Sequence, residues 1–298
     1  MAKNKSKDNS RGAEGFDSYY SQVYGERWND LKTALLQESN PVSYNLSSLL
    51  SDNDPEIPLR TYYLDCASIL AAFSLPLKGA KDILDLCAAP GGKTLVISSL
   101  MDEDASLTSN ERSFERKQRL SKVVEEHVPL HIRERISITC SDGALWCKTK
   151  TDCYDRILLD APCSSERHVL NDEKYLLQWS PARIKTLAME QWALLSSAYR
   201  MLKSGGMLLY STCALAPKEN DEVVERLFKK FEDAECLYID SEEYKKISND
   251  FNKITVFSEN LRLPQYEKTK YGYQILPDAQ NGAGPIYFAI LKKRVSVL

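Results

Sequence analysis

The stretch Asp85-Leu86-Cys87-Ala88-Ala89-Pro90-Gly91-Gly92-Lys93-Thr94 decides the fold, because it joins a buried strand to a helix through a glycine-rich turn. The apolar run Ile83–Leu86 predicts the strand, and a helix is predicted from the turn through Met101. A strand, a turn and a helix in this order begin a βαβ unit, which builds a parallel sheet. Such sheets bind ligands at the carboxyl ends of their strands, so we expect a site at this turn.

The same rhythm of short apolar runs and helical stretches continues along the chain. Further strands are predicted at about Ser106–Ser109, Ile136–Cys140, Tyr154–Asp160, Met207–Thr212 and Pro285–Leu291. One helix is expected from Arg112 to about Glu126, and another from Ser180-Pro181 until Gly205-Gly206 stops it. The predicted fold is α/β, a doubly wound sheet with its ligand crevice at the carboxyl ends of the strands.

The residues before this sheet predict two smaller parts. Residues 1–15 are polar and are expected to form a disordered basic tail. Residues 16–80 are expected to form a helical extension that contacts RNA, and residues 81–298 the catalytic domain. Within the extension, one helical stripe between residues 16 and 36 is predicted to be buried: Tyr19, Tyr20, Trp28, Leu31, Leu35 and Leu36.

Composition and charge narrow the class of protein. The 298 residues are 43% hydrophobic, which excludes a disordered or fibrous chain. No apolar run is long enough to cross a membrane, and no signal peptide is visible, so we expect a cytoplasmic protein. We also expect a monomer. The net charge of −3 means that nucleic-acid binding must use local patches. Basic patches lie at residues 1–11, at 112–135 with seven Lys and Arg against four Glu, and at 292–294. Each is also typical of an ordinary solvated surface.

The eight cysteines do not predict a metal site. Cytosolic thiols are kept reduced, and no pair of cysteines has the CxxC spacing of a zinc site. The chain has only three histidines that could serve as ligands. We therefore expect no metal.

The glycine-rich turn permits two interpretations. Gly92-Lys93-Thr94 resembles the end of a Walker A loop, and the strand ending at Asp160 resembles a Walker B strand, so a P-loop NTPase is an alternative. That motif requires glycine where Cys87 stands, and Pro90 removes an N–H group from the loop.

The other interpretation of the glycine-rich turn is a binding site for a cofactor that carries a nucleoside. Glu111 follows the second strand, where an acid can bind ribose hydroxyls, and Asp142 follows the third, where it could meet the adenine amine. These positions favour S-adenosylmethionine (SAM) or a dinucleotide, and the absence of GxGxxG disfavours the dinucleotide.

Two cysteines follow neighbouring strands of the predicted sheet. Asp160-Ala161-Pro162-Cys163 follows the fourth strand and Tyr210-Ser211-Thr212-Cys213 ends the fifth, so both thiols are expected to face one crevice. An arbitrary cysteine is more often a small buried apolar residue. Here the position beside a cofactor turn favours chemistry: a thiolate that adds to carbon 6 of a pyrimidine makes carbon 5 nucleophilic, and a second group then assists release. Asp160 could bind the N3/N4 edge of cytosine. The spacing alone leaves the roles of the two thiols open.

The motifs DLCAAPGGKT, LLDAPCSS, MLKSGGMLLYSTC and KENDEVV resemble the Nop/Sun family of SAM-dependent RNA cytosine-C5 methyltransferases. The likeness begins near residue 16 and extends to GPIYFAILKK, and it is strongest for short members without an added RNA-binding domain. It implies a Rossmann-like methyltransferase sheet, mostly parallel with an antiparallel last strand, and RNA as the substrate, with rRNA favoured over tRNA. It further implies that Cys213 is the nucleophile and that Cys163 assists product release. The residues that it places at the SAM site are Cys87, Ala88, Ala89, Pro90, Gly91, Gly92, Lys93, Glu111, Arg116, Asp142 and Asp160.

The sequence also departs from the family pattern. Glu111 stands where Asp is more common, and Ser164-Ser165-Glu166-Arg167-His168 replaces a more frequent Ser-Gly-Thr run. No stretch resembles a PUA-like or NusB-like domain. Substrate choice is therefore expected from residues 1–80, from the helix near 112–122, from the 164–180 loop, or from a protein partner. A catalytically silent RNA-binding subunit remains an alternative, against which the presence of both cysteines argues.

Overall fold

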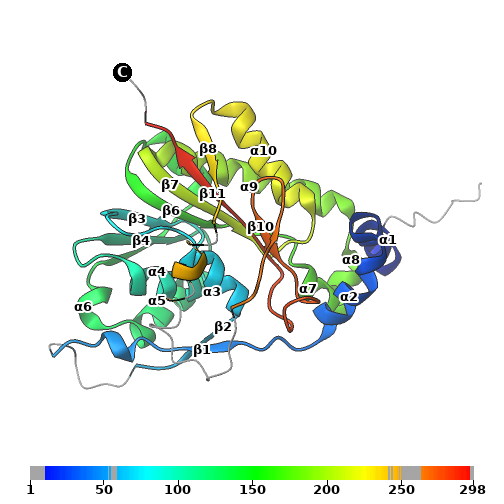
Figure 1. The fold of residues 1–298 in the computed structure, drawn as a ribbon, viewed down its shortest axis with the longest axis horizontal. Coiled ribbons are helices and arrows are strands. Elements are labelled where there is room, and N and C mark those ends of the chain that lie inside the picture. Colours follow the sequence, from blue (N-terminus) through cyan, green and yellow to red (C-terminus); the bar gives the residue numbers. More distant parts are fainter. Residues whose placement is uncertain are drawn as a thin grey trace, which may run out of the picture.

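The structure is a computed structural model that describes residues 11–52, 54, 59–240, 242, 244–247, 249 and 263–295. Its centre is one twisted sheet with helices on both faces (Figure 1). The strands follow the order β5-β4-β3-β6-β7-β11-β10-β9, and β8 pairs with β11. This is the predicted doubly wound order, because the chain starts in the middle at β3 and reverses direction between β3 and β6.

The first five strands of this sheet are parallel. They are β3 (Asp82–Asp85), β4 (Ser106–Glu111), β5 (Ile136–Cys140), β6 (Tyr154–Asp160) and β7 (Leu202–Thr212). Strand β11 (Ile286–Lys293) then runs antiparallel beside β7. The remaining strands β8 (Ala234–Leu237), β9 (Glu267–Lys268) and β10 (Tyr273–Ile275) are short. The mostly parallel α/β fold with an antiparallel last strand is therefore confirmed.

Alternate residues of the strands enter two hydrophobic cores, as the period of a strand requires. Ile83 packs on one face with α3 (Cys66–Phe73), α4 (Gly92–Leu100) and α5 (Phe114–His127). Leu84 packs on the other face with α9 (Pro181–Met201) and α10 (Asp221–Lys230). The short elements α6 (Leu130–Arg133), η3 (Gly143–Lys148) and η4 (Pro217–Glu219) complete the connections between strands.

The N-terminal helices pack beside the carboxyl ends of β6 and β7. The chain forms α1 (Gly12–Tyr24), η1 (Gly25–Arg27) and α2 (Trp28–Leu36), and these helices contact α7 (Glu166–Leu170) and α8 (Glu173–Gln178). Figure 1 shows α1 and α2 grouped with α7 and α8 at one end of the sheet. A third core of aromatic and aliphatic side chains fills this junction: Phe16, Tyr20, Trp28, Leu31, Leu35, Val169, Leu170, Trp179, Ile184, Leu215, Ala216 and Leu276.

The predicted stripe of this segment is correct in its centre and wrong at its ends. Tyr20, Trp28, Leu31 and Leu35 are buried, whereas Tyr19 is only partly buried and Leu36 is 49% exposed. The stripe fails at Leu36 because α2 ends there and the chain turns into an extended connection. After it, β1 (Val42–Tyr44) and β2 (Tyr62–Leu64) form a small antiparallel sheet, and η2 (Ser47–Leu49) lies between them.

Three local predictions need correction. Helix α1 begins at Gly12, so residues 12–15 are helical and not disordered, while residues 1–10 lie outside the described residues. Helix α9 ends at Met201, and Gly205-Gly206 lie inside β7 rather than at a helix stop. Ser180 precedes Pro181 as predicted, but its side chain makes no cap hydrogen bond.

Candidate active site

The turn between β3 and α4 needs glycine at two positions for two different reasons. Gly91 has a φ of +122°, which side chains rarely tolerate, and a Cβ there would lie 2.8 Å from Cγ1 of Val123. A Cβ on Gly92 would lie 2.3 Å from Cδ2 of Leu64 in strand β2. The turn is therefore packed between α5 on one side and the small β1–β2 sheet on the other.

A cavity of about 300 Å³ opens at the carboxyl ends of β3, β4 and β5. Cys87, Glu111, Arg116 and Asp142 line it, together with Pro162 and Leu194. The Glu111 carboxylate accepts a hydrogen bond from the N–H of Ser113 at 2.9 Å, and Arg116 donates to the carbonyl of Ala89 at 2.7 Å. Asp142 accepts from the N–H of Ala144 at 3.0 Å. Two fixed carboxylates thus face one cavity whose walls are partly apolar, which suits a nucleoside.

A second cavity of about 280 Å³ lies on the other side of the turn. It is lined by Cys87, Ala88, Ala89, Pro90, Gly92, Lys93, Asp85, Asp160 and Cys213, among others. Asp85 is fully buried; Oδ2 accepts from Thr94 at 2.7 Å, and Oδ1 has no partner within the described structure. Burial raises the pKa of Asp85 to about 7. An unpartnered carboxylate oxygen in a cavity fits the ammonium group of an amino-acid ligand. The two cavities together therefore fit SAM, which has a nucleoside at one end and an amino acid at the other.

Lys93 lies between this cofactor region and the cysteines. Its Nζ donates to Asp160 at 2.7 Å and to Ser68 of α3 at 2.9 Å. Burial alone would lower the pKa of Lys93, but the neighbouring Asp160 carboxylate raises that pKa above its ordinary value. The ammonium is therefore charged, held in place, and close enough to Cys213 to interact with its thiolate.

The two cysteines meet in the structure. Strands β6 and β7 are parallel neighbours, with Asp160 opposite Ser211, and the two Sγ atoms of Cys163 and Cys213 lie 2.9 Å apart. Ser165 Oγ lies 3.5 Å from the first sulfur and 3.4 Å from the second. The hydrogen bond from Cys163 lowers the pKa of Cys213, and the same bond, with burial, raises the pKa of Cys163. Of the two thiols, Cys213 is therefore the one that loses its proton more readily.

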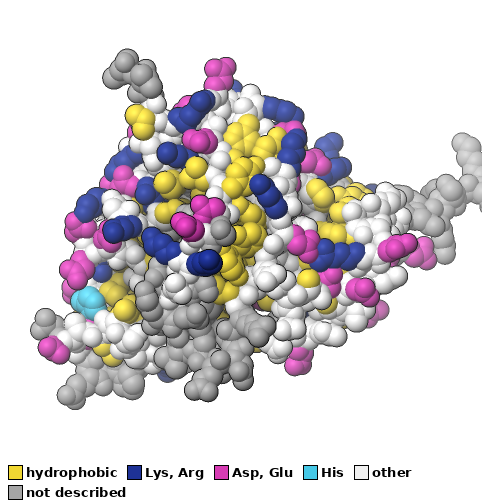
Figure 2. Space-filling view, viewed as in Figure 1, with side chains coloured by type: hydrophobic (Ala, Val, Ile, Leu, Met, Phe, Trp, Pro, Cys, Tyr) yellow, Lys and Arg dark blue, Asp and Glu magenta, His cyan; other side chains and the backbone are white. Residues whose placement is uncertain are grey.

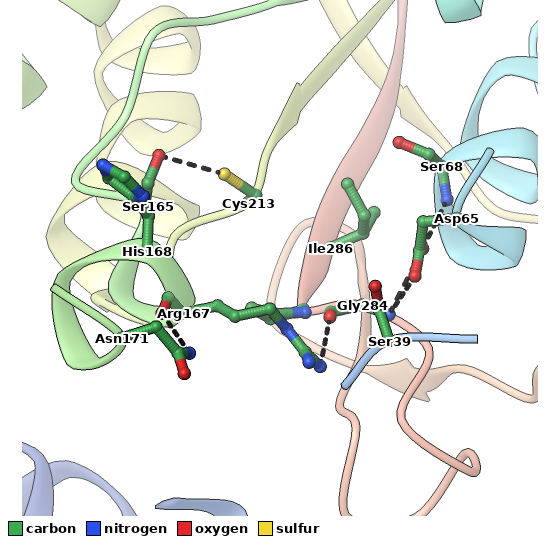
Figure 3. Close-up of a pocket in the computed structure, with 11 residues that line it drawn as sticks. Ser39, Asp65, Ser68, Ser165, Arg167, His168, Asn171, Cys213, Gly284 and Ile286 are labelled. Atoms are coloured by element: carbon green, nitrogen blue, oxygen red, sulfur yellow. Dashed lines mark hydrogen bonds between the residues drawn. The ribbon is translucent and has the colours of Figure 1, made fainter. Parts of the chain in front are cut away.

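A third cavity of about 480 Å³ extends outward from Cys213 (Figure 3). Residues from four parts of the chain line it: Ser39 after α2, Asp65 and Ser68 at α3, Ser165 to Asn171 at α7, and Gly284 to Ile286 at β11. Asp65 accepts from the N–H of Gly284 at 3.0 Å, and Arg167 donates to the carbonyls of Gly282 and Gly284 at 2.8 and 2.9 Å. Figure 3 shows Cys213 and Ser165 at one end of this space, with Asp65 and Ser68 across from them. Cys213 thus lies between the cofactor region and an open pocket that has both polar and apolar walls.

The structure brings together nearly all the residues that the sequence singled out. Cys87, Glu111, Arg116 and Asp142 line the first cavity, and the residues from Cys87 to Lys93 line the second, except Gly91, which packs against α5. The sequence analysis did not single out Asp85 as a site residue, although Asp85 is the first residue of the glycine-rich motif. It also missed Asp65, Ser68, Arg167 and Asn171, whose positions depend on contacts between distant segments.

Neither a metal site nor a membrane span is found in the part of the chain that the structure describes. Within those residues, no group of three or more His, Cys, Asp or Glu side chains is arranged to hold a metal ion. None of the described helices is both long and apolar enough to cross a membrane. The C-terminal basic patch makes contacts within the chain, because Lys293 pairs with Asp152 at 2.7 Å and Arg294 donates to the carbonyl of Glu232.

Comparison with known proteins agrees with this geometry. The chain is similar to the 5-cytosine rRNA methyltransferase NSUN4 of Mus musculus, with 33% identity over 79% of this chain and 61% of the relative. It is also similar to the mitochondrial tRNA (cytosine(34)-C(5))-methyltransferase of Danio rerio, with 31% identity over 88% of this chain and 72% of the relative. The chain spans 56–61% of the length of the four NSUN4 relatives that it matches.

A solved structure has the same fold, and a family model identifies the family. A crystal structure of a methyltransferase homolog protein from Pyrococcus horikoshii superimposes with a TM-score of 0.67 at 19% identity, covering 94% of this chain and 95% of that one. The family model described as 16S rRNA methyltransferase RsmB/F matches residues 72–292. This match confirms the predicted resemblance to the Nop/Sun methyltransferases and argues against a P-loop NTPase. The chain belongs to the RsmB/F family of methyltransferases.

Proposed function

We propose that this protein transfers a methyl group from SAM to carbon 5 of a cytosine in RNA through a covalent cysteine–cytosine intermediate. The observation that carries the proposal is the thiol pair of Cys163 and Cys213, 2.9 Å apart, at the point where the cofactor region meets the 480 Å³ pocket. One thiol of a touching pair can attack a base while the other remains beside the reacting atoms.

The residues around the first two cavities are proposed to hold SAM. Glu111 would accept hydrogen bonds from the ribose hydroxyls, Asp142 would meet the adenine amine, and Asp85 would pair with the ammonium group. When bound, SAM supplies an electrophilic methyl group. The loop from Cys87 to Lys93 would then orient it toward Cys213, which lines the same cavity.

The cysteines are proposed to divide the chemistry between them. Sγ of Cys213 adds to carbon 6, and the electron pair of the C5–C6 double bond moves to carbon 5, which takes the methyl group. The carbon-5 proton then leaves to a base, and the C5–C6 double bond re-forms as the bond from sulfur to carbon 6 breaks. Once Cys213 has reacted, its sulfur no longer accepts the bond that raises the pKa of Cys163. Cys163 is then free to assist proton removal and release.

The 480 Å³ pocket is proposed to take the target cytosine. Asp160, fixed by Lys93 and by Ser211 at 2.8 Å, lines the neighbouring 280 Å³ cavity together with Cys213, and it would bind the N3/N4 edge of a base that reaches Cys213. The base must leave its stack to reach Cys213, so an unpaired or flipped cytosine is expected. Residues 16–80 contribute Ser39, Asp65 and Ser68 to this pocket, which supports their proposed contact with RNA.

We favour rRNA over tRNA as the substrate, because the NSUN4 relatives from several vertebrates are named as rRNA methyltransferases. The Danio rerio relative is named as a tRNA enzyme, so the test must examine both kinds of RNA.

On the face shown in Figure 2, Lys and Arg alternate with Asp and Glu rather than forming one patch. A protein partner could therefore assist targeting. Monomeric state and a cytoplasmic location remain predictions.

The proposal is tested by bisulfite sequencing of total RNA from cells that lack the gene. We expect one or a few 5-methylcytosines to disappear, to return with the wild-type gene, and not to return with Cys213→Ala. If Cys213→Ala restores the mark, the nucleophile is wrong. If no mark changes while the purified protein binds RNA, the silent-subunit alternative replaces this proposal.

A further inference from the structure

Two carboxyl groups lie fully buried behind the cysteine pair. Glu166 begins α7 and Glu219 ends η4, and both side chains are 0% exposed. Burial raises the pKa of both, that of Glu219 to about 7. Burying two neighbouring acids is costly unless donors surround them, so their presence directly behind the reactive thiols calls for a physical reason.

Glu166 connects three segments that are far apart in the sequence. Its Oε1 accepts from the hydroxyl of Tyr20 in α1 and from the hydroxyl of Ser164, the residue after Cys163. Its Oε2 accepts from the N–H of Leu215, two residues after Cys213, at 3.0 Å. One carboxylate therefore holds the loop of each cysteine and fastens both to the N-terminal helix.

Glu219 holds the Cys163 loop from the opposite side. Its Oε2 accepts from the N–H of Ser164 at 2.9 Å and from Nε2 of Gln191 at 2.8 Å. The same Nε2 donates to the carbonyl of Pro162 at 2.8 Å, so the residues on both sides of Cys163 are fixed. Ser164 is thus bound through its N–H by one carboxylate and through its hydroxyl by the other.

The residue between this clamp and the sulfurs is in an unusual conformation. Ser165 has φ 55° and ψ 61°, a left-handed conformation that residues other than glycine seldom adopt and that persists only where neighbours enforce it. Its Oγ contacts the sulfurs of both cysteines. Movement of Ser164 would therefore move Ser165 and change the distance between the two thiols.

We propose that Glu166 is a positioning residue that sets the geometry of the Cys163–Cys213 pair, and that it does so only while helix α1 is docked through Tyr20. The role in methylation rests on the proposed function, but the effect on the thiol geometry does not. Residues 12–24 then belong to the working active site although none of them reaches the thiols.

The test compares Glu166→Gln and Tyr20→Phe with Tyr44→Phe. The last is a matched control, since Tyr44 is equally buried and loses a single hydroxyl bond, to Ser99 at 2.6 Å, away from the cysteine loops. We expect kcat to fall about tenfold or more in the first two variants, while KM for RNA and Kd for SAM stay within about twofold. The double variant should lose less than the product of the two single effects, because both changes weaken the same hydrogen-bond network around Glu166. Tyr44→Phe should keep the wild-type kcat.

A second measurement reads the thiol geometry without any methylation. Diamide takes two electrons and two protons from a pair of adjacent thiols and joins them as a disulfide. We expect the Cys163–Cys213 crosslinked peptide, followed by mass spectrometry, to form about tenfold more slowly in Glu166→Gln and Tyr20→Phe than in the wild type or Tyr44→Phe.

Unchanged crosslinking and unchanged kcat in folded Glu166→Gln would overturn the proposal, as would an equal loss in Tyr44→Phe. If Glu166→Gln does not fold, Tyr20→Phe and Ser164→Ala decide the question by the same two readouts. If the wild type crosslinks rapidly and the variants slowly, but no RNA is methylated, then the proposed function fails and the positioning role stands.

Discussion

The turn after β3 and the loop after β6 both end at the active site, but they are held in different ways. The β3–α4 turn is built from one contiguous stretch: Thr94 bonds Asp85, and the residues from Cys87 to Lys93 line the cavity directly. The loop from Ala161 to Ser165 is held directly by Gln191 and Glu219, and through Glu166 by Tyr20; Tyr20, Gln191 and Glu219 come from three distant segments. The first places its cavity-lining residues within one motif, whereas the second is held mainly by hydrogen bonds from residues far away in the sequence.

The largest effect is expected where the two regions meet, at the thiols. Cys213→Ala cannot form the adduct and should lose all detectable methylation. Cys163→Ala should attack and methylate, then stall as an RNA–protein complex that requires SAM and survives denaturing electrophoresis. The double variant should show no complex. If the roles of the two cysteines are exchanged, the trapped complex should form in Cys213→Ala instead. If both single variants still methylate RNA, the covalent mechanism is refuted.

The next largest effect is expected on the binding of SAM in the nucleoside cavity. Glu111→Ala removes a carboxylate that lies in the nucleoside cavity and should weaken SAM binding by about 1.5–3 kcal/mol, the range for a hydrogen bond to a charged group. Calorimetry measures this directly. The cysteine geometry should not change, so diamide crosslinking at the wild-type rate is the control. Unaltered SAM affinity would remove Glu111 from the ribose site.

A smaller effect is expected on the pH dependence of SAM binding. In the free protein, burial raises the pKa of Asp85 to about 7, so a proton competes with the SAM ammonium for this carboxylate. SAM affinity should therefore rise between about pH 6 and 7.5, and Asp85→Asn should bind more weakly with a flat profile. The stability of the folded protein depends on pH in the opposite direction. A carboxyl whose pKa is raised on folding stabilises the free protein below its unfolded pKa of 3.8, and this stabilisation is lost as the pH rises through about 7. An equally steep SAM profile in Asp85→Asn would refute this assignment.

The smallest effect is expected at the surface of α5, outside both regions. Arg119 pairs with Glu115, and Lys122 lies 3.9 Å from Glu126, so the patch is partly neutralised, and exposed pairs of this kind contribute little to stability. Reversing the charges of Lys117, Arg119 and Lys122 together should lower RNA affinity and its salt dependence while SAM affinity is kept. Filter binding at two salt concentrations measures both. If RNA affinity is unaffected, the patch is only a solvated helix face.

The N-terminal segment shows how far sequence reasoning reached. Its helical stripe predicted that Tyr20, Trp28, Leu31 and Leu35 are buried, because a period near 3.6 reports one helix face. The pattern could not show what that face packs against. The structure places it on α7 and α8, where the hydroxyl of Tyr20 meets Glu166. Glu166 itself was visible in the sequence only as a departure from a more frequent motif.

By itself, the sequence determined the order of the parallel strands, the glycine-rich turn, the two cysteines at neighbouring strand ends and the acids at the carboxyl ends of β4 and β5. These features follow from local periodicity and from the rule that parallel strands present their carboxyl ends at one edge. Only the tertiary structure decided that Asp85 has an unpartnered oxygen, that Lys93 pairs with Asp160, and that Glu166 joins both cysteine loops to α1. Those facts depend on burial and on hydrogen bonds between residues up to 146 positions apart, which no local pattern encodes.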